Sequence, residues 1–225
     1  MKIAFILRGH IRESLEDSRL KDYVSLLKKI GHSVDLYCHT WHESEAKSSY
    51  RSLDRSRLFE VKRSHLTDYF AEHEIKKIWI ANDEKIELHG NLEGTLPNSK
   101  CPLVAWKRMW AGKHAVVSYL YHNRSYDYDL VVNCRYDLFT TAVCYTPVKN
   151  LVKMTAGKSE LSLKYPKYYR YLKGVDNYYC GPLNHIYDIT SAFHYNLDEI
   201  IPKYSIKGVH EELFYKYAVD VGLVK

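Results

Sequence analysis

Residues 126–139 read YDYDLVVNCRYDLF, and this stretch decides the fold class. Its apolar centre predicts a short buried strand over residues 129–133, with Arg135 and Asp137 following at the carboxyl end of that strand. Ligands of open α/β sheets bind outside the carboxyl ends of the strands. A carboxylate there can bind a hard divalent cation, and a guanidinium group beside it suits a phosphate. The stretch favours a diphosphate site, although an aspartate after a strand is also a common turn residue.

A strand, a helix and a second strand open the chain. Residues 2–7 form an apolar run that predicts a buried strand, residues 15–30 carry apolar side chains at helical spacing, and residues 33–39 predict the next strand. This order predicts a parallel pair of strands with a right-handed crossover. We therefore expect an α/β fold with a mostly parallel central sheet flanked by helices.

The rest of the chain predicts one domain over residues 1–225, because no linker, repeat or low-complexity segment divides it. Further helices are expected at residues 64–73, 102–121, 183–195 and 211–221, and further strands at residues 58–61, 75–80 and 175–180. Residues 81–100 predict a long loop, and residues 140–152 predict a loop or an edge strand. The Lys- and Tyr-rich residues 164–173 predict an exposed loop.

The charge balance suits an anionic ligand. Lys and Arg number 33 against 27 Asp and Glu, but the basic residues are scattered, so no nucleic-acid partner is expected. The 21 tyrosines have flat faces that suit sugars and bases, although AT-rich codon usage produces the same excess. Five cysteines without a CxxC pair argue against a zinc site or a disulfide framework. No window predicts a membrane span or a signal peptide, and we expect a cytoplasmic protein.

The segment after the first strand, RGHIR at residues 8–12, is a second candidate for phosphate binding. Backbone amide groups in a turn at Gly9 can cradle an anion, and Arg8 and Arg12 can pair with it. The segment is not a GxGxxG motif, which disfavours a classical dinucleotide-binding fold. A surface turn with solvated arginines is the alternative.

The tetrapeptide HTWH at residues 39–42 follows the second strand at the same edge. Trp41 could stack on a base and Thr40 could bind the edge of that base, whereas a tryptophan at the edge of the core is the alternative. The two histidines lack a third ligand nearby and do not indicate a metal site. On the long helix, Lys107 or Arg108 could point toward the phosphate or lie on the solvated face.

Acidic residues late in the chain are candidates for acid–base chemistry, in which a carboxylate takes the proton of a hydroxyl group or stabilises a cationic centre. Asp176 lies beside a predicted strand, and Glu211 and Glu212 lie at the start of a predicted helix. Acids in a first helical turn also stabilise the helix itself, which is the alternative for one of the two glutamates.

Taken in order, these motifs resemble the small GT-A-type glycosyltransferases of large DNA viruses and of bacterial surface-polysaccharide clusters. The motifs are RGHIR after the first strand, HTW after the second, WK in the long helix, YDLVVNCRYDL around the central strand, DN before an aromatic pair and Gly-Pro, and EELF near the end. They are spread over most of the chain. Among such enzymes, the virus-encoded kind that glycosylates capsid protein is the one that the sequence resembles.

The resemblance implies a single GT-A-like (Rossmann-like) domain that transfers a sugar from a nucleotide-diphosphate sugar to a glycan or glycoprotein acceptor. A UDP-sugar is the first expectation and a GDP-sugar the next. The resemblance also implies a Mn²⁺ or Mg²⁺ ion. Where the family has Asp-x-Asp, this sequence has Arg135-Tyr136-Asp137. Asp137 is then the expected metal ligand, and Arg135 would replace the first carboxylate at the diphosphate.

The resemblance also divides the domain into a nucleotide-binding part, about residues 1–140, and an acceptor-side part, about residues 141–225. A virus-encoded enzyme of this kind would act in the host cytoplasm. The expected cofactor-binding residues are Leu7, Arg8, Gly9, Arg12, Thr40, Trp41 and Lys107, and the expected catalytic residues are Arg135, Asp176 and Glu211.

Two other classes of protein stay open. A non-catalytic α/β module that binds a nucleotide or a glycan would also fit the replacement of the first aspartate by Arg135. A nucleotidyltransferase or nuclease commonly assembles two or more carboxylates around two metal ions, and the sequence shows only Asp137 in such a place. Asp137→Asn separates an enzyme from a module, because transfer would collapse whereas glycan binding need not change.

Overall fold

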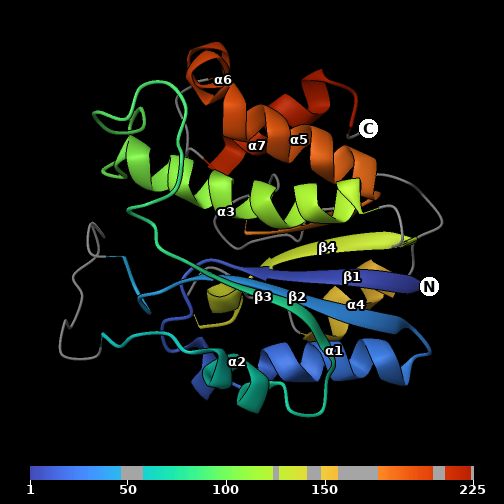
Figure 1. Cartoon of the computed structure of the whole chain (residues 1–225). Helices are drawn as coiled ribbons and strands as arrows, with labels where there is room; N and C mark the ends of the chain where they lie inside the picture. The colour runs from blue at the N-terminus through green and yellow to red at the C-terminus, as the bar shows by residue number, and fades with distance from the viewer. Residues whose placement is uncertain (47–57, 124–126, 141–147, 157–176, 205–210, 224–225) are drawn as a thin grey trace.

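A single five-stranded sheet forms the centre of the protein, in the order β3-β2-β1-β4-β5 (Figure 1). The computed structural model describes residues 1–46, 58–123, 127–140, 148–156, 177–204 and 211–223. Within them, β5 runs antiparallel to β4 and the other neighbours are parallel. The strands are β1 (Lys2–Arg8), β2 (Ser33–Trp41), β3 (Ile75–Ala81), β4 (Leu130–Arg135) and β5 (Tyr178–Gly181). The predicted α/β class with a mostly parallel sheet is confirmed.

Helices cover both faces of the sheet (Figure 1). One face carries α1 (Arg19–Lys29), α2 (Arg63–Tyr69) and α4 (Val148–Ala156). The other carries α3 (Leu103–His122), α5 (Leu183–Tyr195), α6 (Leu197–Tyr204) and α7 (Glu211–Asp220). Two short 3-10 turns, η1 (Ser14–Glu16) and η3 (Tyr136–Leu138), follow β1 and β4. In the described part of the chain, no helix has both the length and the apolar character needed to cross a membrane.

The central strand β1 is buried on both faces. Phe5 and Leu7 pack into the core that includes α1 and α4. Ala4 and Ile6 pack into the second core, beneath α3 and α5. A strand that is covered on both faces has a continuous apolar sequence, and β1 has such a sequence. The same alternation places the last residue of the strand, Arg8, on the α3 side of the sheet.

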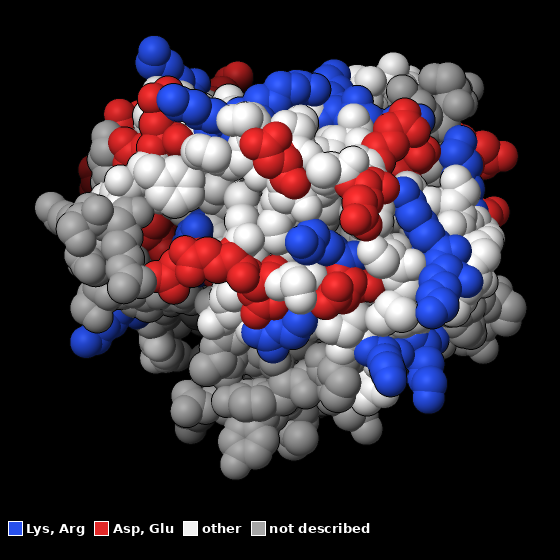
Figure 2. All heavy atoms as spheres, turned by 90° about the horizontal axis from the view of Figure 1, so that it is seen from below, with Lys and Arg blue, Asp and Glu red and all other residues white. Residues whose placement is uncertain are grey.

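The surface on the α1 and α2 side carries charges of both signs. Figure 2 views the molecule from below Figure 1 and shows acidic and basic side chains interspersed over this face. The described residues of this face therefore form no extended basic patch. By contrast, three arginines lie close together at one edge of the sheet.

Most predicted elements are confirmed, with ends shifted by a few residues. The strands expected near residues 2–7, 33–39, 75–80 and 129–133 are β1, β2, β3 and β4, and the helix expected at residues 183–195 is α5. The helix expected at residues 15–30 is shorter, because η1 precedes α1. The strand expected at residues 175–180 is β5, and residues 175–176 lie outside the described residues.

Three regions differ from the predictions. Residues 58–61 make only an isolated bridge, between Glu60 and Glu43, and no strand. Residues 148–156 form α4, although residues 148–152 were expected in a loop or an edge strand. Its Leu151 and Val152 are buried in the core beside α1. A short apolar run is compatible with a helix or a strand, and here packing selects the helix.

The helix α6 was not predicted, because it contains Pro202, and proline disfavours the interior of a helix. Residues 141–147 and 157–176 lie outside the described residues.

The helix α3 approaches β2 closely at Gly112. A Cβ atom on Gly112 would lie 2.6 Å from Cε1 of His39 and 3.3 Å from Cζ2 of Trp41. Both rings are buried, so neither has empty space into which it could move. Gly112 therefore sets the distance between α3 and the carboxyl end of β2.

Gly112→Ala tests this close approach. A glycine-to-alanine change inside an exposed helix face stabilises the helix by about 1 kcal/mol, whereas overpacking a buried contact costs about 1–3 kcal/mol. We expect a net loss of up to about 2 kcal/mol in the free energy of unfolding, measured by urea denaturation. Ala115→Gly, at an exposed position of α3, reports the helix contribution alone. Stabilisation by Gly112→Ala would contradict the close approach.

Candidate functional site

The order of the strands reverses between β1 and β4. From β1 the chain builds β2 and β3 on one side, and it then returns to the other side for β4. In open α/β sheets, ligands bind at such a switch point, outside the carboxyl ends of the strands. Across this edge Arg8 is in register with His39 of β2 and with Arg135 of β4. All three side chains lie on the α3 side, by the alternation of buried residues along each strand.

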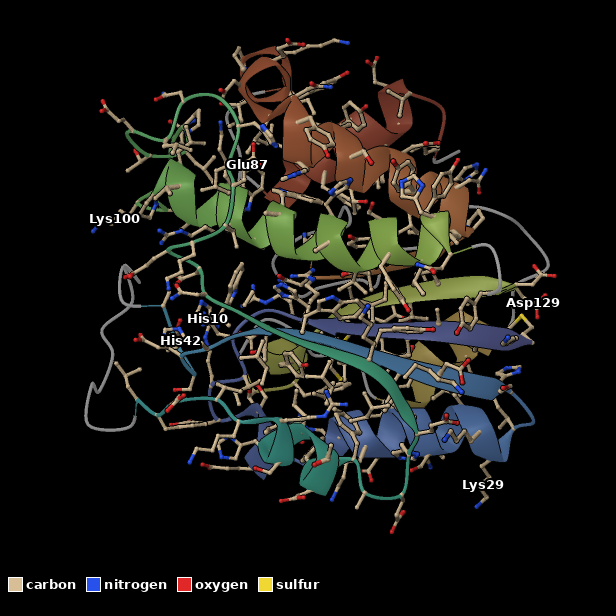
Figure 3. The ribbon with its side chains drawn as sticks, in the orientation of Figure 1. His10, Lys29, His42, Glu87, Lys100 and Asp129 are labelled. Carbon is tan, nitrogen blue, oxygen red and sulfur yellow. The ribbon has the colours of Figure 1, made fainter. Side chains whose placement is uncertain are left out.

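Figure 3 shows the two ends of the sheet. His10 and His42 lie close together at the carboxyl ends of β1 and β2, and Asp129 lies at the opposite end. The carboxylate of Asp129 accepts a hydrogen bond from the backbone N–H of Lys2 at 2.7 Å. Asp129 is therefore a structural residue at the amino end of β4.

Arg8 is a buried charged residue that lies between its register partners His39 and Arg135. Its side chain is 2% exposed, and its Nε donates to Oδ1 of Asn133 at 2.8 Å. Asn133 is fully buried, and its Nδ2 has no hydrogen-bond partner in the described structure. Nδ1 of the buried His39 also has none. Unpaired buried polar atoms are rare and point to a ligand or an ordered water.

The chain turns sharply after β1. Gly9 has φ +98°, in the left-handed region that only glycine enters without strain. Arg12 has φ +48°, which is uncommon for a residue with a side chain. The backbone N–H of Arg12 donates to the carbonyl of Ser44 at 2.9 Å, which ties this turn to the loop after β2. The turn directs the guanidinium group of Arg12 between Glu45 and Asp137.

Asp137 links the two arginines. It lies in η3 and is 2% exposed. Arg135 binds it through two parallel hydrogen bonds, Nε to Oδ1 at 2.7 Å and Nη2 to Oδ2 at 2.5 Å. Nη1 of Arg12 also donates to Oδ2. Paired hydrogen bonds between charged groups are the strongest that side chains make, so Asp137 holds both guanidinium groups in place.

The other side of Arg135 is held by Asn177, just before β5. Nη1 of Arg135 donates to Oδ1 of Asn177 at 2.8 Å, and the backbone N–H of Arg135 donates to the Asn177 carbonyl at 3.0 Å. Arg8, Arg12 and Arg135, which we call the arginine cluster, thus lie at the switch point with two carboxylates, Asp137 and Glu45. A cluster of guanidinium groups at this place favours an anionic ligand.

The donor set around Asp137 does not fit a divalent cation. Both of its oxygens already accept hydrogen bonds from guanidinium groups. A unit charge about 5 Å from a guanidinium group is repelled by roughly 3 kcal/mol at an effective dielectric constant of 20. Among the described residues, no three His, Cys, Asp or Glu side chains are arranged to hold a metal ion. A Mn²⁺ or Mg²⁺ ion at Asp137 stays a prediction from resemblance.

The aromatic residues after β2 are packed inside the protein. Trp41 is 4% exposed and contacts the ring of His39 edge-on, at 4.9 Å between centroids. Its faces are therefore covered, in agreement with the core-edge alternative. Nδ1 of His10 lies 3.1 Å from the carbonyl oxygen of Glu43, and burial lowers the pKa of His10. Burial also lowers the pKa of His39 to about 4, which keeps its imidazole neutral at pH 7.

Three expected cofactor-binding residues lie away from the arginine cluster. The side chains of Leu7 and Thr40 are fully buried, and alternation points them to the α1 side of the sheet. Leu7 and Thr40 could therefore contact a ligand at the arginine cluster only through their backbone groups. Nζ of Lys107 donates to the carbonyl of His89 and pairs with Asp198 at 2.6 Å. Lys107 thus ties the loop before α3 to α6.

The two late catalytic candidates are not placed by the structure. Asp176 lies outside the described residues, next to Asn177, where the description resumes. Glu211 is the first residue of α7, and its side chain is not described. Their roles stay predictions.

The structure adds Asn133, Asn177 and Glu45 to the site. A signal for Asn133 is present in the sequence, because it is a polar residue inside the apolar run of a buried strand. Asn177 directly follows the candidate Asp176, but nothing local indicates that it binds Arg135. Glu45 lies in a polar loop with no pattern to distinguish it.

No protein-family model matches the sequence, and no curated protein matches it.

The burial of His39 predicts how stability depends on pH. The unfolded chain binds a proton near pH 6.5, whereas the folded protein binds one at His39 only near pH 4. Stability from this residue is therefore present above pH 6.5 and is lost as the pH falls toward 4. We expect the free energy of unfolding to drop by up to about 1.4 kcal/mol per pH unit in this window, measured by urea denaturation.

The matched variant is His39→Gln, which removes the titrating group. Its curve of stability against pH should be flatter than that of the wild type below pH 6.5. At pH 8 imidazole is neutral in both states, so the difference between the two proteins there gives the packing cost of the substitution. Parallel curves from pH 8 to pH 5 would contradict the assignment.

Proposed function

We propose that the protein is a glycosyltransferase that moves a sugar from a nucleotide-diphosphate sugar, with a UDP-sugar as first choice, to a glycan or glycoprotein acceptor. The observation that carries the proposal is the gathering of Arg8, Arg12 and Arg135 at the switch point. A diphosphate offers the negative charge and paired oxygens that guanidinium groups bind best. The resemblance to GT-A-type enzymes supports the sugar part of the proposal, and the choice of uracil rests on that resemblance alone.

The chemistry assigned to the cluster is stabilisation of the leaving group. When the bond from the anomeric carbon to the diphosphate breaks, its electron pair passes to the diphosphate oxygen. Arg12 and Arg135 are already held by Asp137, so they bind the developing charge without reorganisation. The acceptor oxygen forms the new bond to the anomeric carbon. Its proton passes to a carboxylate, for which Asp176 and Glu211 are the candidates.

A non-catalytic module that binds a nucleotide or a glycan is the second candidate. The observation in its favour is that both described carboxylates of the site, Asp137 and Glu45, are paired with arginines. A paired carboxylate is a poor base. Catalysis then depends on an acid outside the cluster, which the variants below test.

Arg135→Gln tests nucleotide binding. UDP, GDP and CDP are titrated into the protein by calorimetry, each with and without Mn²⁺. We expect one nucleotide to bind, and its affinity to fall about tenfold or more in Arg135→Gln, because a hydrogen bond to a charged group is worth about 1.5–3 kcal/mol. Lys29→Gln is the matched control, since it removes one positive charge at the end of α1, far from His10 (Figure 3).

An equal loss of affinity in Lys29→Gln and Arg135→Gln would show that binding reflects only net charge. Absence of binding by all three nucleotides in both conditions would remove the glycosyltransferase proposal. Binding of one nucleotide selects the base and thereby the sugar donors to be tested for transfer.

Asp176→Asn and Glu211→Gln separate the enzyme from the binding module. In an enzyme we expect one of them to lower kcat by about 100-fold or more, because it removes the proton acceptor, with nucleotide affinity within twofold of the wild type. Glu212→Gln is the neighbouring control for Glu211. The measurement is release of nucleoside diphosphate from the donor in the presence of a glycan acceptor. Unchanged kcat in all three variants would contradict a role for these acids.

A further inference from the structure

We propose that the arginine cluster binds the diphosphate without a divalent cation, and that Asp137 is an internal counter-anion rather than a metal ligand. The inference rests on the proposed function for the identity of the ligand.

The first observation is the direction of the donors around Asp137. Two N–H groups of Arg135 and one of Arg12 point at its two oxygens. A metal ion would need lone pairs of these oxygens, and it would lie beside two guanidinium groups of its own sign. The site is therefore built for an anion at the position of the carboxylate, not for a cation bound to it.

The second observation is the rest of the cluster. Glu45 neutralises Arg12 on its other side, and Asn177 binds Arg135 through a neutral oxygen. Arg8 contacts the neutral amide of Asn133. Three guanidinium groups together suit a ligand with more than one negative charge.

The third observation is an unused buried donor beside Arg8. Nδ2 of Asn133 is buried without a hydrogen-bond partner in the described structure, and Oδ1 of the same side chain accepts from Arg8. Asn133 lies in β4 two residues before Arg135, on the same side of the sheet. An amide N–H suits a phosphate oxygen.

These contacts predict the sign of a mutational effect. Asp137→Asn removes a negative charge but keeps nearly the same shape, so the guanidinium groups face an incoming anion with one more uncompensated positive charge. Metal-free anion binding should therefore become tighter. A metal ligand behaves in the opposite way, because its loss weakens binding wherever the ion takes part.

The probe is inorganic pyrophosphate, titrated by calorimetry in EDTA into the wild type, Asp137→Asn and Glu45→Gln. We expect pyrophosphate to bind the wild type and to bind Asp137→Asn at least about threefold more tightly. Glu45→Gln removes the same charge from Arg12 alone, and a smaller gain is expected. Absence of binding to the wild type in EDTA, or weaker binding to Asp137→Asn, would overturn the inference.

A second measurement needs no variant. Mn²⁺ alone is added to the wild type, and the bound ion is followed by electron paramagnetic resonance. We expect no bound Mn²⁺ at submillimolar concentration. Stoichiometric binding of Mn²⁺ by the wild type in this concentration range would overturn the inference. If Asp137→Asn does not fold, pyrophosphate and Mn²⁺ binding by the wild type still decide the question.

The outcomes for the two proposals differ. If pyrophosphate binds in EDTA but UDP, GDP and CDP do not, the anion site stands and the glycosyltransferase proposal fails. If a nucleotide binds only with Mn²⁺, the glycosyltransferase proposal stands and the metal-free site fails.

Discussion

The ion pairs around Asp137 are the interaction on which the rest of the site depends. The carboxylate joins Arg12, from the loop after β1, to Arg135, at the end of β4. Removing one partner of a buried ion pair costs about 3–5 kcal/mol, and less here because both guanidinium groups are one-fifth exposed. The loops on the two sides of the switch point are thereby held in one arrangement. A ligand then meets arginines whose conformational freedom is already lost, which lowers the cost of binding.

The position of this ion-pair network follows from the topology. β1 and β4 are far apart in the chain but adjacent in the sheet, so Arg8 and Arg135 become register partners. Helices on both faces bury most of β1, β2, β4 and β5, and polar side chains gather at the carboxyl ends of β1, β2 and β4. Gly9 allows the turn that directs Arg12 back toward Asp137. The fold thus converts four separate residues into one charged site, whose chemistry suits a diphosphate.

Much of this architecture is predictable from the sequence. The apolar runs of β1, β2 and β4 predict strands, and the structure confirms them. Because these strands are parallel, their carboxyl ends lie at one edge of the sheet, as expected. The partners of those residues are not predictable in the same way. The contact of Asn177 with Arg135 depends on how β5 pairs with β4, and the covered faces of Trp41 depend on the close approach of α3. Asp137 shows the limit most clearly, because the same aspartate can bind a metal or an arginine, and only tertiary contacts distinguish them.

The central claim is that the arginine cluster holds a diphosphate at the switch point. The most direct test is a crystal structure of the protein with UDP, grown in EDTA. We expect the diphosphate oxygens to lie within hydrogen-bond distance of Arg12 and Arg135, and Asp137 to remain between the two guanidinium groups. A diphosphate bound elsewhere on the protein, or a cluster with no density for UDP at saturating concentration, would contradict it.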